Sequence, residues 1–304
     1  MSDCLISVIM VNYNHKEDVD RCLESLLRSL PEGQCEILVV DNCSTDGAPD
    51  LIAGKYPSVR LTRWQENRGL APGLHYLIEQ SKGEWLFILD SDTIVGAGAI
   101  DAIMKFASAD PRIGAVAPRV RDVSGAIQMT ARVFPNPINA VFGRQTLLSQ
   151  LWPGNTITRR FLKAAHQESN EPFPCDWTAF AAVLVRRAAL VEAGGIDPNF
   201  FVYWVDADFF RRVRNLRWEV WCYPGAEIVH VEQNQPKRIR NPNGIRDFHR
   251  GALRYFYKHH GWGGLNPLLW VAAIGLWIRT QVHLLINWRR MRNGQRACRK
   301  LPLG

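Results

Sequence analysis

The sequence predicts an α/β fold, in which a mainly parallel sheet is flanked by helices and followed by a C-terminal helical appendage. Apolar runs of strand length alternate with helical patterns along residues 5–117, and this rhythm is typical of a parallel sheet. The strand runs are almost continuously apolar, as expected where helices cover both faces of a sheet. Of the 304 residues, 47% are hydrophobic, which is enough to bury a large core.

Five apolar runs are interpreted as strands, at residues 5–11, 35–40, 59–64, 85–89 and 113–117. Three stretches between them have helical periodicity. In the first, apolar residues recur at spacings of three and four from Val19 to Leu30, and Pro31 and Gly33 end the pattern. The other two helices are expected at 69–80 and 97–107.

Polar side chains follow three of these strands, at the edge where open α/β sheets bind ligands. Tyr13 follows the first strand, Asp41 ends the second, and Asp90 and Asp92 follow the fourth. Two carboxylates one residue apart supply hard oxygen ligands for Mg²⁺ or Mn²⁺, and such ions usually serve phosphate groups. Asp41 can accept a hydrogen bond from a base, and Tyr13 can pack on it. The alternatives are a solvated acidic turn at 90–92 and a turn-forming or helix-capping role for Asp41.

Several motifs, in order along the chain, resemble those of the family 2 glycosyltransferases of GT-A fold. In the first part of the chain they are the segments VIMVNYN at 8–14, VVDNCSTDG at 39–47, ENRG at 66–69 and DSD at 90–92. Further on they are RRAAL at 186–190, GGID at 194–197, FFVYWVDAD at 200–208 and AEIVH at 226–230. The resemblance covers roughly residues 5–260. Within the family it is greatest to bacterial rhamnosyltransferase-like enzymes of polysaccharide assembly.

The resemblance implies a nucleotide-diphosphate sugar donor, bound by Val11, Tyr13, Asp41, Arg68 and Asp90. Asp41 would hold the base, with the backbone near Val11 to Tyr13 beside it. Asp90 would contact the ribose or a metal ion, Mn²⁺ or Mg²⁺, whose other protein ligands would be Asp92 and His230. For His230 the alternative is a strand-end histidine that is satisfied by its neighbours.

The resemblance also implies that Asp206 is the general base, which takes a proton from an acceptor hydroxyl as that oxygen attacks the anomeric carbon. One displacement of this kind inverts the anomeric configuration. Residues near this position are expected to bind the acceptor: Trp177, Tyr203, Trp204 and Asp208. Three cations are expected in a mobile loop over the phosphates, with a solvated surface loop as the alternative: Lys237, Arg238 and Arg240.

Two positions depart from the family pattern. Val205 stands where the family usually has Glu before the base. Phe180 stands where the family has a glycine, and is expected to intrude where the backbone should approach the sugar or acceptor. These departures leave a second hypothesis, a catalytically impaired, membrane-associated scaffold of a glycan assembly complex. A nucleotidyltransferase is disfavoured, because residues 12–15 lack a Gly-rich phosphate loop.

The excess positive charge lies in the C-terminal tail. Ten of the 37 basic residues, and none of the 29 acidic ones, follow Asp247, so residues 1–247 are close to neutral. The apolar run 267–278 carries Trp270 and Trp277, but it is shorter than the roughly 20 residues that a spanning helix needs. We expect an interfacial or re-entrant helix on an anionic membrane surface. A helix packed on the catalytic core is the alternative.

These observations divide the chain into a catalytic domain at 1–247 and basic amphipathic helices at 248–304. The domain is expected to have a nucleotide-sugar half at about 1–119 and an acceptor half at about 120–247. Seven scattered cysteines without a CxxC pair indicate free thiols, and no signal peptide is evident, so a peripheral location on the cytoplasmic face of the cell membrane is expected. The expected partners are the nucleotide sugar and a lipid-linked or glycan acceptor. Nucleic acid is not expected, because the charge is confined to the tail, and homo-oligomer formation is left open.

Overall fold

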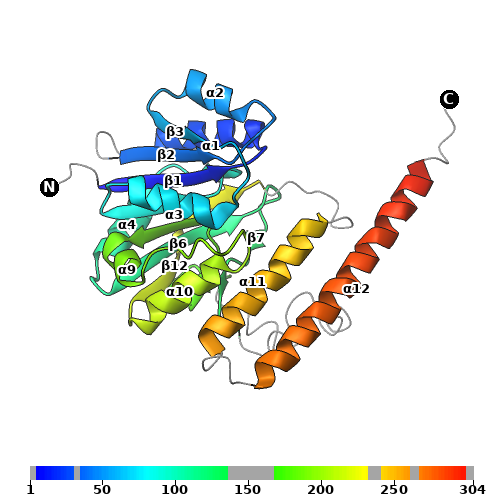
Figure 1. The fold of residues 1–304 in the computed structure, drawn as a ribbon. Helices are drawn as coiled ribbons and strands as arrows, with labels where there is room; N and C mark the ends of the chain where they lie inside the picture. The colour runs from blue at the N-terminus through cyan, green and yellow to red at the C-terminus, as the bar shows by residue number, and fades with distance from the viewer. Residues whose placement is uncertain (1–4, 31–34, 136–167, 232–240, 261–266, 299–304) are drawn as a thin grey trace. The chain divides into compact units, whose positions relative to one another are not determined.

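The computed structural model describes residues 5–30, 35–135, 168–231, 241–260 and 267–298. The chain forms two units, one of residues 1–201 and 205–232 and one of residues 202–204 and 233–304. The first unit contains a ten-stranded sheet in the order β3-β2-β1-β4-β11-β6-β12-β5, with β7 beside β6 and β9 beside β12 (Figure 1). A separate two-stranded sheet pairs β10 with β8.

The strands of the ten-stranded sheet are β1 (Ile6–Asn12), β2 (Cys35–Asp41), β3 (Val59–Arg63), β4 (Trp85–Leu89), β5 (Thr93–Val95), β6 (Ile113–Arg121), β7 (Ile127–Gln128), β9 (Phe173–Pro174), β11 (Ala182–Arg186) and β12 (Glu219–His230). The short sheet contains β8 (Ala131–Arg132) and β10 (Trp177–Thr178). The helices of this unit are α1 (Lys16–Ser29), α2 (Ala48–Lys55), α3 (Leu70–Gln80), α4 (Ala99–Ser108), α9 (Arg187–Glu192) and α10 (Val205–Asn215).

The predicted mainly parallel sheet is confirmed. Strands β3, β2, β1 and β4 run parallel, and the register of β1 on β2 sets Asn12 opposite Asp41. The sequence pattern did not reveal β11, which comes from later in the chain and lies antiparallel between β4 and β6. Its apolar residues Ala182 to Val185 are typical of any buried strand, and nothing local to them specifies their partners.

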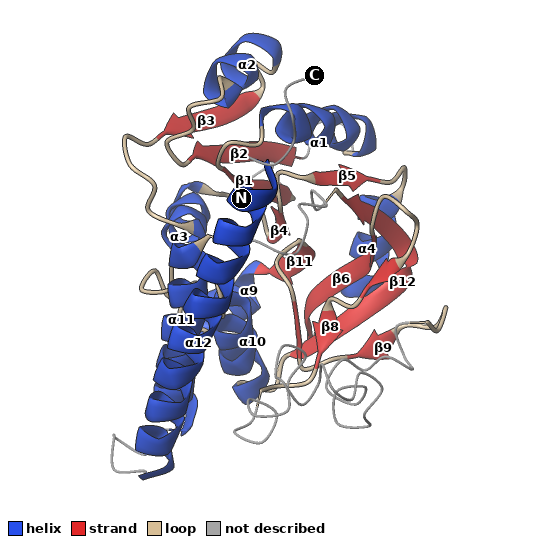
Figure 2. Cartoon of the chain, turned by 90° about the vertical axis from the view of Figure 1, so that its right-hand side faces the viewer, coloured by secondary structure: helices blue, strands red, loops and turns tan. Residues whose placement is uncertain are grey.

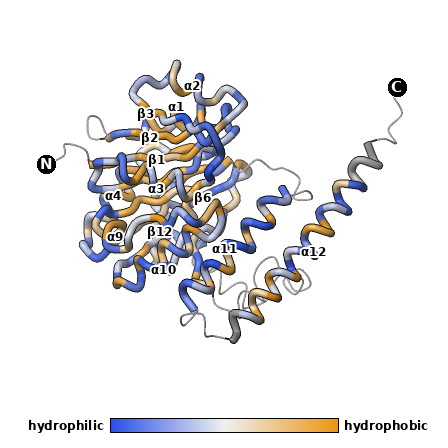
Figure 3. Tube along the Cα trace, in the orientation of Figure 1, coloured by the Kyte–Doolittle hydropathy of each residue, from blue (hydrophilic) through white to orange (hydrophobic). Residues whose placement is uncertain are grey.

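Alternate residues of the central strands bury against helices on opposite faces of the sheet. Val8 and Met10 join one apolar core with residues of α1 and α4. On the other face Val11 lies against α3, where Gly73 leaves room: a Cβ there would lie 2.6 Å from Val11 Cγ2. Figure 2 shows α1 and α4 on one side of the sheet and α3, α9 and α10 on the other. The strands are the most apolar part of this unit (Figure 3).

The predicted helices α1, α3 and α4 are present, and α2 is an addition. Helix α2 is short, contains Pro49 and Gly54, and buries only Ala48 and Ile52, so it has little helical periodicity in the sequence. It begins after Gly47, whose φ of 85° is readily available only to glycine among the common residues.

The second unit consists of α11 (Pro242–His260), α12 (Pro267–Cys298) and the short segment 202–204. Asp247 on α11 accepts hydrogen bonds from the main-chain N–H groups of Val202 and Tyr203, at 3.1 and 3.2 Å. Trp204 packs its ring on those of Phe248, Tyr255 and Phe256, with centroids 5.4–5.9 Å apart. Helix α11 begins before the expected domain boundary at residue 247, and that boundary stays a prediction.

Helix α12 continues through the polar residues Arg279, Thr280, Gln281 and His283 without a break. Orange, apolar positions recur along it in Figure 3. Within the described part of the chain, no helix combines the length and the hydropathy needed to cross a membrane.

Candidate donor and metal site

The carboxyl ends of three adjacent parallel strands gather the predicted donor-side residues at one edge of the sheet. Strand β1 ends at Asn12, β2 at Asp41 and β4 at Leu89, directly before Asp90. Since β1 lies between β2 and β4, the segment after Asn12 emerges between Asp41 and Asp90.

Asp41 is only 2% exposed and organises the loop that follows it. Its Oδ2 accepts a hydrogen bond from Asn12 Nδ2 at 3.0 Å, and its Oδ1 accepts one from the main-chain N–H of Ser44 at 2.9 Å. The turn-forming alternative therefore describes what Asp41 does in this structure. Asn12 Oδ1 is buried without a hydrogen-bond partner among the described residues. This acceptor can therefore receive a hydrogen bond from a bound ligand. Tyr13 beside it is 44% exposed.

The ENRG loop is fixed by a side-chain amide and a glycine. Asn42 Oδ1 accepts a hydrogen bond from the main-chain N–H of Arg68 at 2.9 Å, while the Arg68 guanidinium pairs with Glu66 at 3.1 Å. Gly69 has φ 93°, and a Cβ there would lie 2.5 Å from the ring of Phe201. The main-chain carbonyl of Phe201 accepts a hydrogen bond from Leu70 N at 2.7 Å. The loop is thereby tied to the segment that leads toward Asp206.

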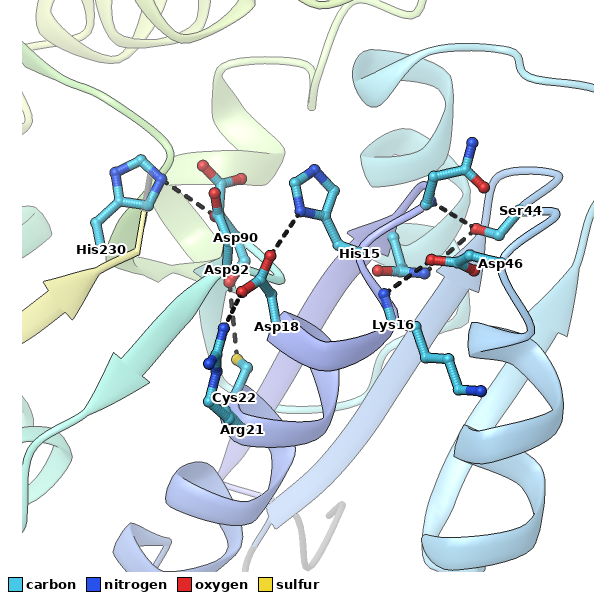
Figure 4. Close-up of polar contacts among 12 residues, drawn as sticks. His15, Lys16, Asp18, Arg21, Cys22, Ser44, Asp46, Asp90, Asp92 and His230 are labelled. Atoms are coloured by element: carbon cyan, nitrogen blue, oxygen red, sulfur yellow. Dashed lines mark hydrogen bonds and ion pairs between the residues drawn. The ribbon is translucent and has the colours of Figure 1, made fainter. Parts of the chain in front are cut away.

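Asp90, Asp92 and His230 converge in this structure. One ligand atom from each lies within 4.8 Å of the other two. Strand β12 brings His230 there by pairing with β5, which sets His230 opposite Thr93, and His230 Nε2 lies 3.1 Å from Asp92 Oδ1 (Figure 4). His230 Nδ1 lies 2.9 Å from Gln128 Oε1, so the Nδ1–H donates to that amide and Nε2 faces Asp92.

This donor set fits a divalent cation. Burial first, and then the neighbouring charge of Asp92, raise the pKa of Asp90 to about 7 against the opposing effect of His230. Two carboxylates this close repel each other unless a proton or a cation lies between them. Without a cation, a protonated Nε2 of His230 can donate to Asp92 Oδ1, while Nδ1–H stays bonded to Gln128. Loss of the Nε2 proton frees that lone pair, together with the two carboxylates, to bind a cation.

Asp206 lies in the first turn of α10, and burial raises its pKa to about 6. The nearby guanidinium of Arg132 and the N–H of Ala207, which donates to Oδ1 at 2.8 Å, oppose this rise. The charge of Asp206 in turn raises the pKa of Asp90, although less than burial and Asp92 do, so the two carboxyl groups share one electrostatic environment. A half-buried carboxylate with a pKa near neutrality is suited to accept a proton.

The residues expected at the acceptor site are divided between the two units of the chain. Asp208 is fully buried and accepts hydrogen bonds from Arg212 at 3.0 and 3.1 Å, and its contact with an acceptor stays a prediction. Trp177 is buried, and its indole N–H donates to the carbonyl of Val133 at 2.9 Å. Tyr203 and Trp204 belong to the second unit. The phosphate-loop candidates lie outside the described residues: Lys237, Arg238 and Arg240.

Two site residues escaped the sequence reasoning. Gln128 lies in a two-residue strand, and only the pairing of β7 with β6 carries it toward His230. Arg132 sits opposite Trp177 in the short β8–β10 sheet and lies over its ring at 4.9 Å. Both lie in short, irregular stretches without periodicity, so the sequence offered no signal for either.

A family model for glycosyl transferase family 2 matches residues 7–180 of this chain. The chain belongs to glycosyltransferase family 2. It is 31% identical, over 318 aligned positions, to the N-acetylglucosaminyl-diphospho-decaprenol L-rhamnosyltransferase of Mycobacterium tuberculosis, with 100% of this chain and 98% of that protein covered. The resemblance drawn from the motifs is thus confirmed, and the protein is a glycosyltransferase.

Solved structures of GT-A glycosyltransferases share the fold. GalNAc-T7, crystallised with UDP, GalNAc and Mn²⁺, superposes with a TM-score of 0.59 at 15% identity, covering 82% of this chain and 47% of that one. The mannosyltransferase PcManGT of Pyrobaculum calidifontis, solved with GDP-Man and Mn²⁺, gives 0.56 at 18% identity, with 96% and 75% covered.

One of the two departures from the family pattern has a structural explanation. Phe180 was expected to intrude where the backbone approaches the sugar or acceptor, but the side chain lies elsewhere. It is buried, and its ring packs on those of Phe209 and Phe210 in α10 at 5.8 and 5.7 Å. The turn after β10 directs this side chain into the core, where it supports the helix that carries Asp206. Val205, at the position of the family Glu, is buried at the start of the same helix.

Proposed function

We propose that this glycosyltransferase is metal-dependent and inverting, and that it transfers L-rhamnose from a nucleoside-diphosphate donor to a lipid-linked N-acetylglucosaminyl-diphosphate acceptor in cell-wall polysaccharide synthesis. The observation that carries the chemistry is the convergence of Asp90, Asp92 and His230 with the electrostatically coupled Asp206. The full-length similarity to a rhamnosyltransferase named for such an acceptor supports the sugar and the acceptor.

Asp90, Asp92 and His230 would hold the metal ion. Two carboxylates suit Mg²⁺ and Mn²⁺ equally, but an imidazole ligand favours the softer Mn²⁺. When bound, the ion would neutralise negative charge that develops on the diphosphate leaving group. Gln128 would keep the His230 lone pair directed at the ion.

Asp206 would act as the general base. A sugar hydroxyl is a weak nucleophile, and a positioned carboxylate removes its proton as the C–O bond forms at the anomeric carbon. With a pKa of about 6, Asp206 is largely ionised at neutral pH yet remains more basic than an exposed carboxylate. A single attack opposite the leaving group inverts the anomeric configuration.

The donor nucleotide would lie along the carboxyl edge of β2, β1 and β4. Asp41 and the main chain from Val11 to Tyr13 would bind the base, and the exposed Tyr13 ring offers it a stacking surface. Arg68 lies in the loop fixed by Asn42 and would contact the donor from that side. Trp177, Tyr203 and Trp204 stay proposals for the acceptor.

An anionic membrane surface is the partner we propose for α12, on the cytoplasmic face of the cell membrane. Exposed apolar side chains lie within one half of the helix circumference and form the α12 apolar surface: Trp270, Val271, Ile274, Trp277, Ile278, Val282, Leu285, Ile286 and Trp288. Exposed Arg289 and Arg292 continue the same stripe. Tryptophans suit the headgroup level and arginines suit anionic lipid, where a lipid-linked acceptor would also lie.

A transfer assay tests the proposal. Purified protein with Mn²⁺ would receive UDP-, dTDP- and GDP-linked rhamnose together with a short-chain N-acetylglucosaminyl-diphospho-lipid, and the product would be analysed by mass spectrometry and by NMR of its anomeric centre. We expect a rhamnosylated lipid of inverted configuration with at least one donor. Transfer from other nucleotide sugars only would disprove the sugar assignment, and a retained configuration would disprove the mechanism.

A further inference from the structure

His15 occupies the position between the base-side and metal-side strands. It follows β1 through Asn14, which adopts φ 55° and is held by Ser44 Oγ, an acceptor for its main-chain N–H at 2.9 Å. Asn14 Oδ1 in turn accepts a hydrogen bond from the N–H of Thr45 at 2.8 Å. Asparagine tolerates this left-handed conformation better than most residues, and the bend turns the chain so that His15 begins α1 at the site edge.

A buried carboxylate orients the His15 ring. His15 Nδ1 lies 3.0 Å from Asp18 Oδ2, and the Asp18 side chain is only 3% exposed whereas that of His15 is 36% exposed. Arg21 pairs with the other oxygen of Asp18. A carboxylate buried this deeply must be paired to be tolerated, and a carboxylate accepts a hydrogen bond, so Nδ1 carries the proton. Among the described residues Nε2 has no hydrogen-bond partner.

The metal-site strand is close to this ring. Helix α1, which His15 caps, packs against the turn that follows this strand, with Cys22 Sγ 3.7 Å from the main-chain oxygen of Asp90. Figure 4 draws His15 with Asp18 on one side, and with Asp90, Asp92 and His230 together in the same region. His15 is not among the atoms that converge at the metal site, so it serves a different part of a ligand.

The order of the strands identifies that part. A nucleoside diphosphate is a linear arrangement of base, ribose and diphosphate. Asp41 lies at the end of β2 and the metal-ligand set follows β4, with His15 after the strand between them. A ribose hydroxyl is also the chemical match for Nε2: it donates to the neutral ring and accepts from the protonated one, whereas a phosphate oxygen only accepts.

We infer that His15, oriented by Asp18, binds a ribose hydroxyl of the donor nucleotide. This assignment rests on the proposed function, because it takes the base to lie near Asp41 and the diphosphate near Asp90 and Asp92. His15 thereby helps the enzyme to distinguish the sugar ring of its nucleotide.

Equilibrium binding of nucleotides with and without single hydroxyls tests the inference. The probes are UDP, 2′-deoxy-UDP and 3′-deoxy-UDP, and thymidine diphosphate with and without its 3′-hydroxyl, each with Mn²⁺. In the native protein, loss of the contacted hydroxyl should raise Kd about 3- to 10-fold, as expected for one hydrogen bond. In His15→Ala the Kd of the parent nucleotide should rise by a similar factor. Removal of that hydroxyl should then change the Kd of the variant less than about 2-fold.

His75→Ala is the matched control. His75 is similarly exposed, with its Nδ1 3.1 Å from the carbonyl oxygen of Ile196, and it plays no part in the proposed site. It should leave the hydroxyl dependence unchanged. Asp18→Asn keeps an oxygen that accepts from Nδ1–H and should preserve most of that dependence, while Asp18→Leu should remove it.

The outcomes separate this inference from the proposed function. If His15→Ala binds the nucleoside diphosphates and its Kd still depends fully on the ribose hydroxyl, the role of His15 is overturned and the proposed function stands. Failure of every diphosphate to bind to folded native protein would overturn both.

Discussion

Gln128 Oε1 and His230 Nδ1 are 2.9 Å apart, so a residue of a two-residue strand sets which nitrogen of His230 faces Asp92. Residues that hydrogen-bond to a metal-binding histidine commonly affect metal affinity, because they fix the tautomer and the orientation of the ring. Gln128 thus links an irregular segment to the proposed metal centre.

Replacement of Gln128 should weaken metal binding without removing a ligand. We expect Gln128→Ala to raise the Mn²⁺ concentration for half-maximal activity by about 10- to 100-fold, since His230 loses its acceptor. Gln128→Glu retains an acceptor oxygen and should remain near the native value. Activity measured over a Mn²⁺ titration checks this, with Gln80→Ala as an exposed control. An unchanged Mn²⁺ titration in Gln128→Ala would show that the contact of Gln128 with His230 does not affect metal binding.

Metal removal should abolish transfer reversibly. Because Asp90 and Asp92 repel each other without a cation, chelation should stop turnover, and Mn²⁺ or Mg²⁺ should restore it. Asp92→Ala should lose nearly all activity at any metal concentration. Turnover is followed by release of nucleoside diphosphate. Full activity in excess chelator would refute the metal assignment.

Asp206→Asn should abolish transfer and leave donor affinity within a few-fold, because the amide keeps the size of the carboxylate but not its basicity. In the native protein kcat/KM should fall as pH drops below about 6, where Asp206 takes up a proton. The measurements are a pH–rate profile at saturating Mn²⁺ and donor binding by calorimetry. Near-native transfer by Asp206→Asn would show that another group is the base.

The same substitution should stabilise the fold above neutrality. The pKa of Asp206 rises from 3.8 to about 6 on folding, so the group's favourable contribution is complete below pH 3.8 and is lost as pH rises through 6. A permanently neutral Asn avoids this loss, which amounts to about 1–3 kcal/mol. Unfolding by urea with chelator present should therefore show Asp206→Asn more stable at pH 8 and equal to the native protein near pH 4, within the range where both fold. A gain that is the same at both pH values would point to packing instead of charge.

The arginines at the end of the α12 apolar surface should make membrane binding depend on lipid charge. Each cation near an anionic surface contributes about 1 kcal/mol, so Arg289→Gln, Arg290→Gln and Arg292→Gln together should weaken binding to anionic vesicles about 100-fold. Trp270→Ser with Trp277→Ser should weaken binding to anionic and neutral vesicles alike. Vesicle flotation measures both. Equal binding of the native protein to the two lipids, or no binding, would favour a helix that packs on protein.

The sequence anticipated the parts of this molecule that depend on short stretches of chain. The strands that end at Asn12, Asp41 and Leu89 were predicted from local apolar runs. Their parallel direction follows from the helices that connect them. Contacts between distant segments were not foreseen. The sequence did not indicate that the side chains of Asp208 and Phe180 turn into the core around α10, because periodicity alone does not reveal which side of a turn faces inward. Gln128 gave no signal because it lies in a two-residue strand that only the pairing of β7 with β6 brings toward His230.

The central sheet cannot form completely until strand β11 has been synthesised. This strand fills the gap between β4 and β6, and the carbonyl of Ala181 accepts a hydrogen bond from the N–H of Asp90 at 3.0 Å. On the ribosome, the edges of β4 and β6 must therefore stay unpaired until residues 182–186 have emerged from the exit tunnel. A fragment cut at residue 180, where the family model stops matching, would lack both β11 and β12, so β4, β5 and β6 would carry bare edges and the fragment should aggregate. The carboxylates of Asp90 and Asp92 after β4 thus reach their final backbone geometry only when more than half of the polypeptide has been synthesised.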